Sequence, residues 1–344
     1  MRKEVLAVGC ALMVFCGCGK NNAAQHYESG WAAMEKKDYT TAVNEFQQVI
    51  DQNSKLAESY RAEGIAYYSE KAYPEAIAAF SRSLNNMDDP DKEFKKDVQF
   101  YLAQARMDYG EVDKAIEVYS EILKAGEDEQ AFFLRGKAYI SMEDYKNAEK
   151  DFQRALEGCE DYNLYINIYQ IYVDHNKAVD GDDYLKMALE LEPQDGEDCY
   201  HRGRIYEYEK NYEAARDELK TAMEQGYEDA MLLLGRVYLE MEDPASARSM
   251  YQEYLQKSEQ GAKAYNGLAM CDIYDGAYDS ALENIAQGLK ENSKEDEQGL
   301  LYNEIVAYEY KRDFATAKEK MKIYLEQYPE DEAALRENEF LSTR

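Results

Sequence analysis

Few residues in this sequence have the types and spacing that catalysis or metal binding requires. The three histidines, His26, His175 and His201, are scattered, and no G-x-S-x-G, H-E-x-x-H or P-loop pattern occurs. Cys199 lies two residues from His201, but the second pair that a zinc site needs is missing. Residues 176–187 have a glycine where a calcium loop has one, yet alanine and methionine replace ligand residues. We therefore expect no enzyme, no metal site and no cofactor.

A different chemistry is indicated at the N-terminus, where cysteines follow an apolar run. Two basic residues precede Val5–Phe15, which is too short to span a bilayer and fits the core of a secretory signal. The residues Phe15, Cys16, Gly17 and Cys18 resemble a bacterial lipobox, although leucine is more usual than Phe15. The resemblance implies cleavage before Cys18, whose sulfur would then carry a diacylglyceryl lipid with acyl chains such as palmitate.

Alternatives to lipidation at Cys18 stay open. Cys10 is the rival site, but its apolar run is shorter than a working signal core. An ordinary cleaved signal or a short buried helix would also explain the run. With the anchor at Cys18, residues 1–17 form the signal peptide and residues 18–25 a tether. The chain is then expected to be an extracytoplasmic, membrane-anchored lipoprotein of a bacterial cell.

The charge balance limits the partners. The chain carries 40 basic and 70 acidic residues, a net charge of −30. Such a surface repels nucleic acid and anionic headgroups, so we expect no nucleic-acid partner. Acidic side chains on helices most often form a solvated face, and that interpretation is favoured here over a dedicated cation site.

The segment Ala57–Leu84 shows which elements organise the rest of the chain. Aromatic and small residues recur there at helical spacing: Tyr60, Gly64, Tyr67, Tyr73, Ala76 and Phe80. This spacing resembles the tetratricopeptide repeat, in which two antiparallel helices cross at small residues and large residues fill around the crossing. One such pair cannot bury its apolar face alone, so further copies are expected.

Nine copies are found at an average period of about 34 residues. Eight have a small residue on the second helix followed four residues later by a large one: Ala42/Phe46, Ala76/Phe80, Ala115/Tyr119, Ala148/Phe152, Ala215/Leu219, Ala247/Tyr251, Ala281/Ile285 and Ala317/Met321. The fifth copy has Asp180/Tyr184 at these positions. Twelve residues before the small position, seven copies have glycine or alanine on the first helix. The fifth copy departs from both rules, so its register is the least certain. It is a candidate either for a change of superhelical curvature or for a seam between two halves.

The predicted fold is therefore all-α. The resemblance implies a right-handed superhelical solenoid of about nine antiparallel helix pairs over residues 26–329, with a capping helix and tail at 330–344. The three cysteines of the repeats, Cys159, Cys199 and Cys271, lie in different copies, too far apart to bridge, and are expected to be small packing residues.

The resemblance also implies a binding surface. In that family the first helices line an inner wall along which peptides commonly lie. Matching positions here predict a partner-binding groove lined by Tyr27, Trp31, Arg61, Tyr68, Phe133, Lys137, Tyr165, Tyr169, Tyr172, Tyr200, Arg204, Tyr208, Arg236 and Tyr274. The expected function is a non-catalytic scaffold for a protein or peptide. A lipoprotein that captures glycans on the same tyrosines is the alternative, and rings that only pack between helices are equally compatible with the sequence.

Overall fold

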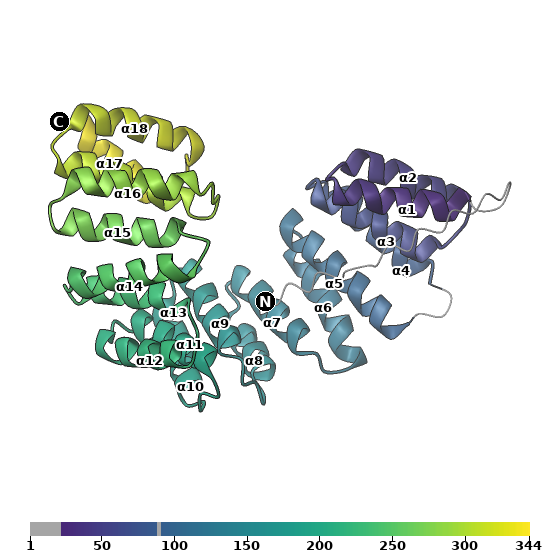
Figure 1. The fold of residues 1–344 in the computed structure, drawn as a ribbon. Helices are drawn as coiled ribbons and strands as arrows, with labels where there is room; N and C mark the ends of the chain where they lie inside the picture. The colour runs from purple at the N-terminus through teal and green to yellow at the C-terminus, as the bar shows by residue number, and fades with distance from the viewer. Residues whose placement is uncertain (1–21, 88–90) are drawn as a thin grey trace. The chain divides into compact units, whose positions relative to one another are not determined.

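A computed structural model describes residues 22–87 and 91–344, which form nineteen α-helices and no strand (Figure 1). The chain divides into two compact units, unit 1 up to Cys159 and unit 2 from Glu160 to Arg344. The division falls directly before the fifth repeat, the least regular one in the sequence. Each unit is described separately below.

Unit 1 contains four helix pairs. They are α1 (Asn22–Glu35) with α2 (Tyr39–Asp51), α3 (Leu56–Ser69) with α4 (Tyr73–Asn85), α5 (Lys92–Tyr109) with α6 (Val112–Ala125), and α7 (Glu129–Ser141) with α8 (Tyr145–Ala155). Residues 22–25 of the predicted tether are thus the first turn of α1, while Cys18 and the signal segment lie outside the described residues.

Unit 2 contains five helix pairs and a last single helix. They are α9 (Tyr162–Asp174) with α10 (Ala178–Leu189), α11 (Gly196–Tyr208) with α12 (Tyr212–Glu224), α13 (Ala230–Glu240) with α14 (Pro244–Lys257), α15 (Ala262–Tyr274) with α16 (Tyr278–Lys290), α17 (Glu297–Tyr310) with α18 (Phe314–Gln327), and α19 (Glu332–Ser342). The predicted array of nine helix pairs with a C-terminal capping helix is confirmed.

A left-handed residue joins the two helices of every repeat, five residues before the small position of the second helix. It is glycine in two repeats, and in the others it has φ between 57° and 63°: Lys37, Lys71, Glu143, Asn176, Lys210, Glu242 and Arg312. In five repeats the next residue is Asp or Asn, whose side chain accepts a hydrogen bond from a backbone N–H of the second helix. The turn therefore ends one helix and caps the next.

The two helices of a repeat cross where glycine on the first meets a large side chain on the second. A Cβ placed on Gly64 would lie 2.6 Å from the Phe80 ring, and one on Gly136 would lie 2.6 Å from Phe152. Real side chains do not approach so closely, so the glycine allows the helices to pack. Ala148, beside this crossing, is fully buried, as the sequence pattern predicts.

The fifth repeat reverses this arrangement, and the predicted register there is wrong by one residue. Asp180 is exposed, whereas Gly181 is buried and Leu185, four residues later, is 1% exposed. Asn176 provides the left-handed turn five residues before Gly181, as in the other repeats. A Cβ on Gly181 would lie 3.1 Å from the ring of Tyr169. Here the large residue comes from the first helix and the glycine from the second.

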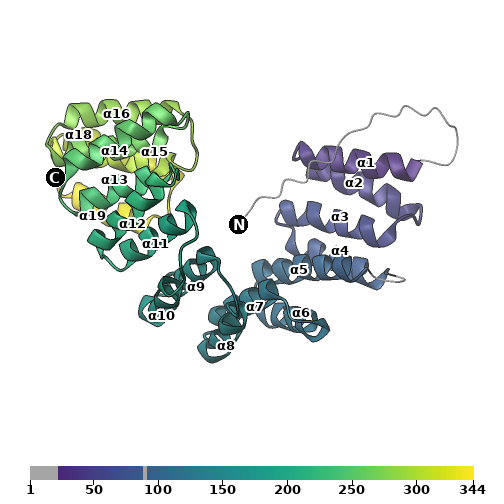
Figure 2. The ribbon, with the colours of Figure 1, turned by 60° about the horizontal axis from the view of Figure 1, so that its bottom comes forward.

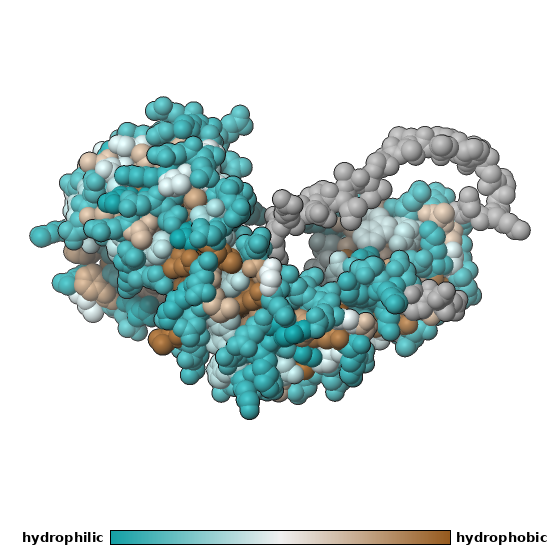
Figure 3. Space-filling model, turned by 90° about the horizontal axis from the view of Figure 1, so that it is seen from below, coloured by the Kyte–Doolittle hydropathy of each residue, from teal (hydrophilic) through white to brown (hydrophobic). Residues whose placement is uncertain are grey.

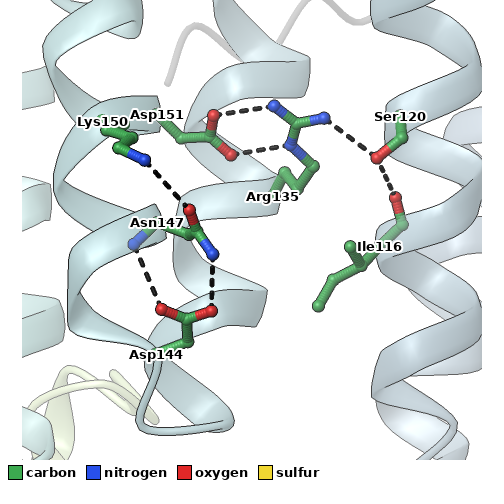
Figure 4. Close-up of polar contacts among 7 residues, drawn as sticks. All are labelled: Ile116, Ser120, Arg135, Asp144, Asn147, Lys150 and Asp151. Atoms are coloured by element: carbon green, nitrogen blue, oxygen red, sulfur yellow. Dashed lines mark hydrogen bonds and ion pairs between the residues drawn. The ribbon is translucent and has the colours of Figure 1, made fainter.

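Ion pairs join the two helices of several repeats one residue before the crossing. Arg135 on α7 donates two hydrogen bonds, of 2.7 and 2.8 Å, to the carboxylate of Asp151 on α8, and a third to Ser120 on α6 (Figure 4). Arg202 pairs likewise with Glu218 at 2.8 Å. Each guanidinium thus pairs with a carboxylate at the helix interface. Without this partner the buried carboxylate would be strongly destabilising.

The second repeat lacks such a partner. Its equivalent residues are Glu63 and Ala79, and Glu63 is 2% exposed with no hydrogen-bond partner for Oε2. Burial raises the pKa of this carboxyl group above its usual range. Helix α3 therefore carries a buried carboxyl group with no basic side chain at the paired position of α4.

The first helices of unit 2 form a continuous surface, here named the first-helix wall. α9 contacts α11, and the contacts continue from α11 to α13, α15 and α17, so that successive pairs stack as layers (Figure 2). At the end of the stack α19 packs on α18 and buries Ala334 and Leu341 beside Met321 and Tyr324. The last repeat is covered, as a solenoid requires.

The outer surface is mostly hydrophilic on the face drawn in Figure 3, in keeping with the acidic composition. The thiols of Cys199 and Cys271 are buried, and burial raises the pKa of Cys271 to about 11. Among the described residues, no helix is both long and apolar enough to cross a bilayer.

Candidate functional site

A pocket of about 700 Å³ opens on the first-helix wall of unit 2. Its walls come from α11, α13 and α15, and its floor from two tyrosines of α14. Its rim comes from two inter-repeat loops, residues 258–261 and 291–296, of which Gln260, Gly261, Glu291, Ser293, Glu295 and Asp296 line the pocket. This volume lies within the range of about 300–1,000 Å³ in which small-molecule and cofactor sites fall.

The floor of the pocket depends on Tyr251. Its ring lies between the first helices of two repeats, because a Cβ on Gly235 of α13 would be 2.6 Å from it and one on Gly267 of α15 only 2.3 Å. Tyr251 is 4% exposed, and burial raises the pKa of its hydroxyl well above the usual range. Tyr254, one turn further along α14, donates a hydrogen bond of 3.4 Å to Asp229. Both rings are therefore fixed by packing.

The walls combine aromatic, apolar and amide groups. The Tyr200 ring lies 4.9 Å from the Tyr227 ring, and burial raises the pKa of the Tyr200 hydroxyl. Asn266 accepts a hydrogen bond of 2.8 Å from Asn303 on the next first helix. Met270 is 41% exposed, so its thioether is open to a ligand.

The two basic residues of the pocket already have acidic partners. Arg236 donates to Glu207 at 2.7 Å, and Lys263 lies 3.3 Å from Glu295 and 3.9 Å from Asp296. Burial lowers the pKa of Lys263, but the hydrogen bond to Glu295 and the nearby carboxylates outweigh it and raise the pKa. Both side chains are therefore held as cations within ion pairs.

The predicted groove residues of unit 1 are mostly engaged within the unit. The rings of Tyr27 and Trp31 pack edge-on against Phe46, at 5.8 and 5.6 Å between centroids. Arg61 donates to Asp97 on the next first helix at 2.5 Å.

Of the three further predicted residues of unit 1, Tyr68 and Phe133 are half-buried and contact neighbouring side chains, whereas Lys137 is open to solvent. Tyr68 donates a hydrogen bond to Asp108, and the Phe133 ring lies 6.2 Å from Phe152.

In unit 2 the predicted residues separate into buried and accessible groups. Tyr165, Tyr169 and Tyr172 of α9 are at most 9% exposed and pack in the interior, so they offer little surface to a partner. Tyr200 and Arg236 line the pocket. The other three lie outside it: Arg204 with its guanidinium 5.9 Å from the Tyr200 ring, Tyr208 with its ring 5.3 Å from that of Tyr169, and Tyr274, which is 54% exposed.

Several pocket residues were not predicted. Lys263 and Asp229 stand at the beginnings of first helices, and Glu291, Glu295 and Asp296 belong to a loop between repeats. Asp229 and Lys263 lie six residues before the small residue of their first helix, which is an inner-wall position in the family, but neither was among the predicted groove residues. The loop residues lie outside the inner-wall rule. Loop composition was the available signal, since residues 291–296 read ENSKED in an otherwise regular array.

Metal chemistry has no visible basis in the described part of the chain. Within residues 22–87 and 91–344, no group of three or more His, Cys, Asp or Glu side chains is placed to hold a metal ion. His201 is 6% exposed, and burial with the nearby Arg204 lowers its pKa to about 4. It is a neutral packing residue at neutral pH.

Sequence profiles of the tetratricopeptide repeat match residues 27–91, 129–161, 200–262 and 232–297, which is more than half of the chain. The chain belongs to the tetratricopeptide repeat family. The tetratricopeptide fold is typically a non-catalytic interaction scaffold, and proteins of the family generally mediate protein–protein interaction. No curated protein sequence gives a significant match.

Several solved structures are similar to this chain at low sequence identity. A tetratricopeptide repeat protein from Parabacteroides merdae has 15% identity over 83% of this chain and 99% of its own, with a TM-score of 0.47. Yeast Tom70 has 15% identity over 89% of this chain and 78% of its own, with a TM-score of 0.49. YrrB, a tetratricopeptide protein with an unusual peptide-binding site, has 26% identity over 55% of this chain and 97% of its own, with a TM-score of 0.36.

Proposed function

We propose that this protein is a non-catalytic scaffold that binds a protein or peptide partner in the pocket of unit 2. The observation that carries the proposal is a pocket of about 700 Å³ on the first-helix wall of a tetratricopeptide array. The packed rings of Tyr251 and Tyr254 hold its walls in place, so a partner meets a preformed surface, which lowers the entropic cost of binding.

Glycan capture is the less favoured alternative. Sugars stack on open aromatic faces, but Tyr251 and Tyr254 in the floor are 4% and 7% exposed. Tyr200 packs against Tyr227, and Arg204 lies over its ring. Little ring face is left for stacking, whereas the exposed Met270 and the polar rim suit a peptide.

Affinity capture with a pocket variant tests the proposal. Met270→Arg places a long charged side chain at the pocket wall, and Val179→Arg is the matched control, because Val179 is 81% exposed on α10 and lies outside the pocket. Proteins captured from detergent-solubilised membranes of the source cell should be lost with Met270→Arg and kept with Val179→Arg. Equal capture by both variants, with helical circular dichroism unchanged, would place the binding surface elsewhere.

We also propose that the scaffold is anchored outside the cytoplasm by a lipid on Cys18. Support comes from the sequence alone, from the basic residues, the apolar run and the small residue before the cysteine. Intact-mass spectrometry of the protein extracted from membranes should give a chain that begins at Cys18 and carries a lipid adduct. A mass that includes residues 1–17, or an unmodified Cys18, would contradict the anchor.

A further inference from the structure

The pocket of unit 2 has an excess of negative charge. Its lining includes Arg236 and Lys263 on the basic side, and Asp229, Glu291, Glu295 and Asp296 on the acidic side. Arg236 is neutralised by Glu207, which stands beside the pocket, and Lys263 by Glu295 and Asp296. The cations are therefore already committed to carboxylates of the protein.

Two pocket carboxylates are left without a basic partner. Among the described residues, no Lys, Arg or His lies within ion-pair distance of Asp229 or Glu291, and both side chains are exposed. Asp229 accepts only the 3.4 Å hydrogen bond from the Tyr254 hydroxyl. The negative potential at this rim is thus available to a cationic ligand group.

Apolar surface lies beside these carboxylates. Leu232 and Met270 line the wall, and Met270 is 41% exposed. A lysine or arginine side chain can lay its methylene stem along such a surface while its charged end reaches a carboxylate at the rim. An apolar or aromatic neighbour in the same segment would cover the thioether.

An acidic ligand would meet the opposite situation. To bind it, Arg236 would have to leave Glu207, which is 15% exposed, and Lys263 would have to leave Asp296, which is 16% exposed. The first exchange would strand a largely buried carboxylate, which is costly. The second would cost less, because Asp296 keeps a hydrogen bond of 2.6 Å from the Ser293 hydroxyl. The new anion would also face Asp229 and Glu291.

We propose that the pocket selects an extended peptide segment in which lysine or arginine adjoins an apolar or aromatic residue. This selection rests on the proposed function, since it specifies which peptides the pocket takes. The basic side chain pairs with Asp229 or Glu291 at the rim, and its neighbour covers Met270.

A random peptide library displayed on phage provides the probe. The bait is residues 18–344, the chain without the predicted signal peptide. Peptides eluted from the wild type should be enriched in Lys or Arg next to Leu, Met, Phe or Tyr. The double variant Asp229→Lys with Glu291→Lys should bind the recovered peptides about tenfold or more weakly, because each attraction becomes a repulsion.

The matched control is the double variant Glu224→Lys with Glu283→Lys. Both residues are exposed on second helices of unit 2 and lie outside the pocket, and the change in net charge is the same. The control should bind the recovered peptides as the wild type does. If both double variants lose binding equally, the attraction is a property of the whole acidic chain and the selection by the pocket is overturned.

The remaining outcomes separate this inference from the proposed function. Enrichment of acidic peptides whose binding Met270→Arg abolishes would overturn the preference for basic segments and keep the pocket as the binding site. Peptides that bind Met270→Arg and the wild type equally would overturn both. Failure to recover any peptide, together with binding of oligosaccharides from a glycan array, would also overturn both and favour glycan capture.

Discussion

One junction between repeats in unit 1 and one in unit 2 use the same pair of positions differently. In unit 1, Arg61 stands fifteen residues before the small position of its repeat, and Asp97 stands eighteen residues before that of the next repeat; they form an ion pair at 2.5 Å. In unit 2 the seventh and eighth repeats have Leu232 and Lys263 at these positions. They cannot pair, and the pocket opens where the bridge is absent.

This difference shows that a repeat array can gain a binding site when the ion pair between successive first helices is lost, without any change at the helix crossings. The helix crossings are kept in both units, so the backbone frame is unchanged. What varies is whether first helices of successive repeats are tied by side chains, as by Arg61 and Asp97, or left with polar groups that face open space, as at Asp229. Binding surface is thus obtained without disturbing the core.

The largest expected effect tests whether the helix pairs of both units cross at equivalent small residues. Ala148→Tyr in unit 1 and Gly181→Tyr in unit 2 each force a ring into a filled crossing and should destabilise by about 3 kcal/mol or more. Asp180→Tyr, at the exposed neighbouring residue, should change stability by less than about 0.5 kcal/mol. Urea unfolding followed by circular dichroism measures all three. A larger loss for Asp180→Tyr than for Gly181→Tyr would restore the register predicted from the sequence.

The second effect tests the bridge itself. Arg61→Leu gives unit 1 the type of residue that unit 2 has, and it removes both the pair with Asp97 and the contact with the Tyr101 ring, 5.2 Å away. We expect a loss of about 1–2 kcal/mol. Lys263→Leu in unit 2 should cost less than half as much, because Glu295 is 81% exposed. Equal losses in urea unfolding would mean that the units do not differ in this respect.

The third effect concerns the unmatched acid of unit 1. Glu63→Gln removes a buried charge that has no partner at Ala79, and it should stabilise by about 1 kcal/mol at neutral pH. Because burial raises the pKa of Glu63, the folded parent loses stability as the pH rises through that pKa, whereas the variant does not. The advantage should therefore shrink toward pH 4. A variant that is less stable than the parent at pH 7 would show that Glu63 has a favourable partner.

The smallest effect lies at the end of unit 2, where the carboxyl group of Glu309 on α17 interacts with that of Glu337 on α19. Burial and the charge of Glu337 raise the pKa of Glu309 to about 7. A raised carboxyl pKa means that stability is highest below the unfolded pKa, near 4.3, and falls as the pH rises toward 7. The melting temperature should thus be slightly higher at pH 5 than at pH 8, and Glu309→Gln should reduce the difference. If the melting temperature of the variant depends on pH as that of the parent does, the pH dependence belongs to other groups.

Most of the fold could be predicted from the sequence because the crossing requires small residues at fixed spacing. Ala42, Ala76 and their counterparts mark every repeat except the fifth. The fifth failed because Tyr169 replaces the small residue of the first helix, twelve residues before Gly181, and packs against that glycine. A pattern that expects glycine on the first helix cannot align such a repeat, but Asn176 at the turn could have.

The site was less predictable than the fold. The inner-wall rule found Tyr200 and Arg236, because the family's inner-wall positions recur at fixed spacing in each repeat. It also selected Tyr165 and Tyr172, which are buried, since the rule assigns a face and not an exposure. Whether Arg61 meets a carboxylate depends on the neighbouring repeat, and this pairing is a tertiary property that a single repeat does not encode.

Hydrogen–deuterium exchange with a bound peptide tests most directly whether the pocket of unit 2 is the partner site. The tightest peptide from the library is added to the full chain, and exchange is compared with and without it. We predict slower exchange at the rim loops, residues 258–261 and 291–296, because their amides lie outside the helices and become covered. Slower exchange confined to unit 1 or to the second helices, with the rim loops unchanged, would contradict the account.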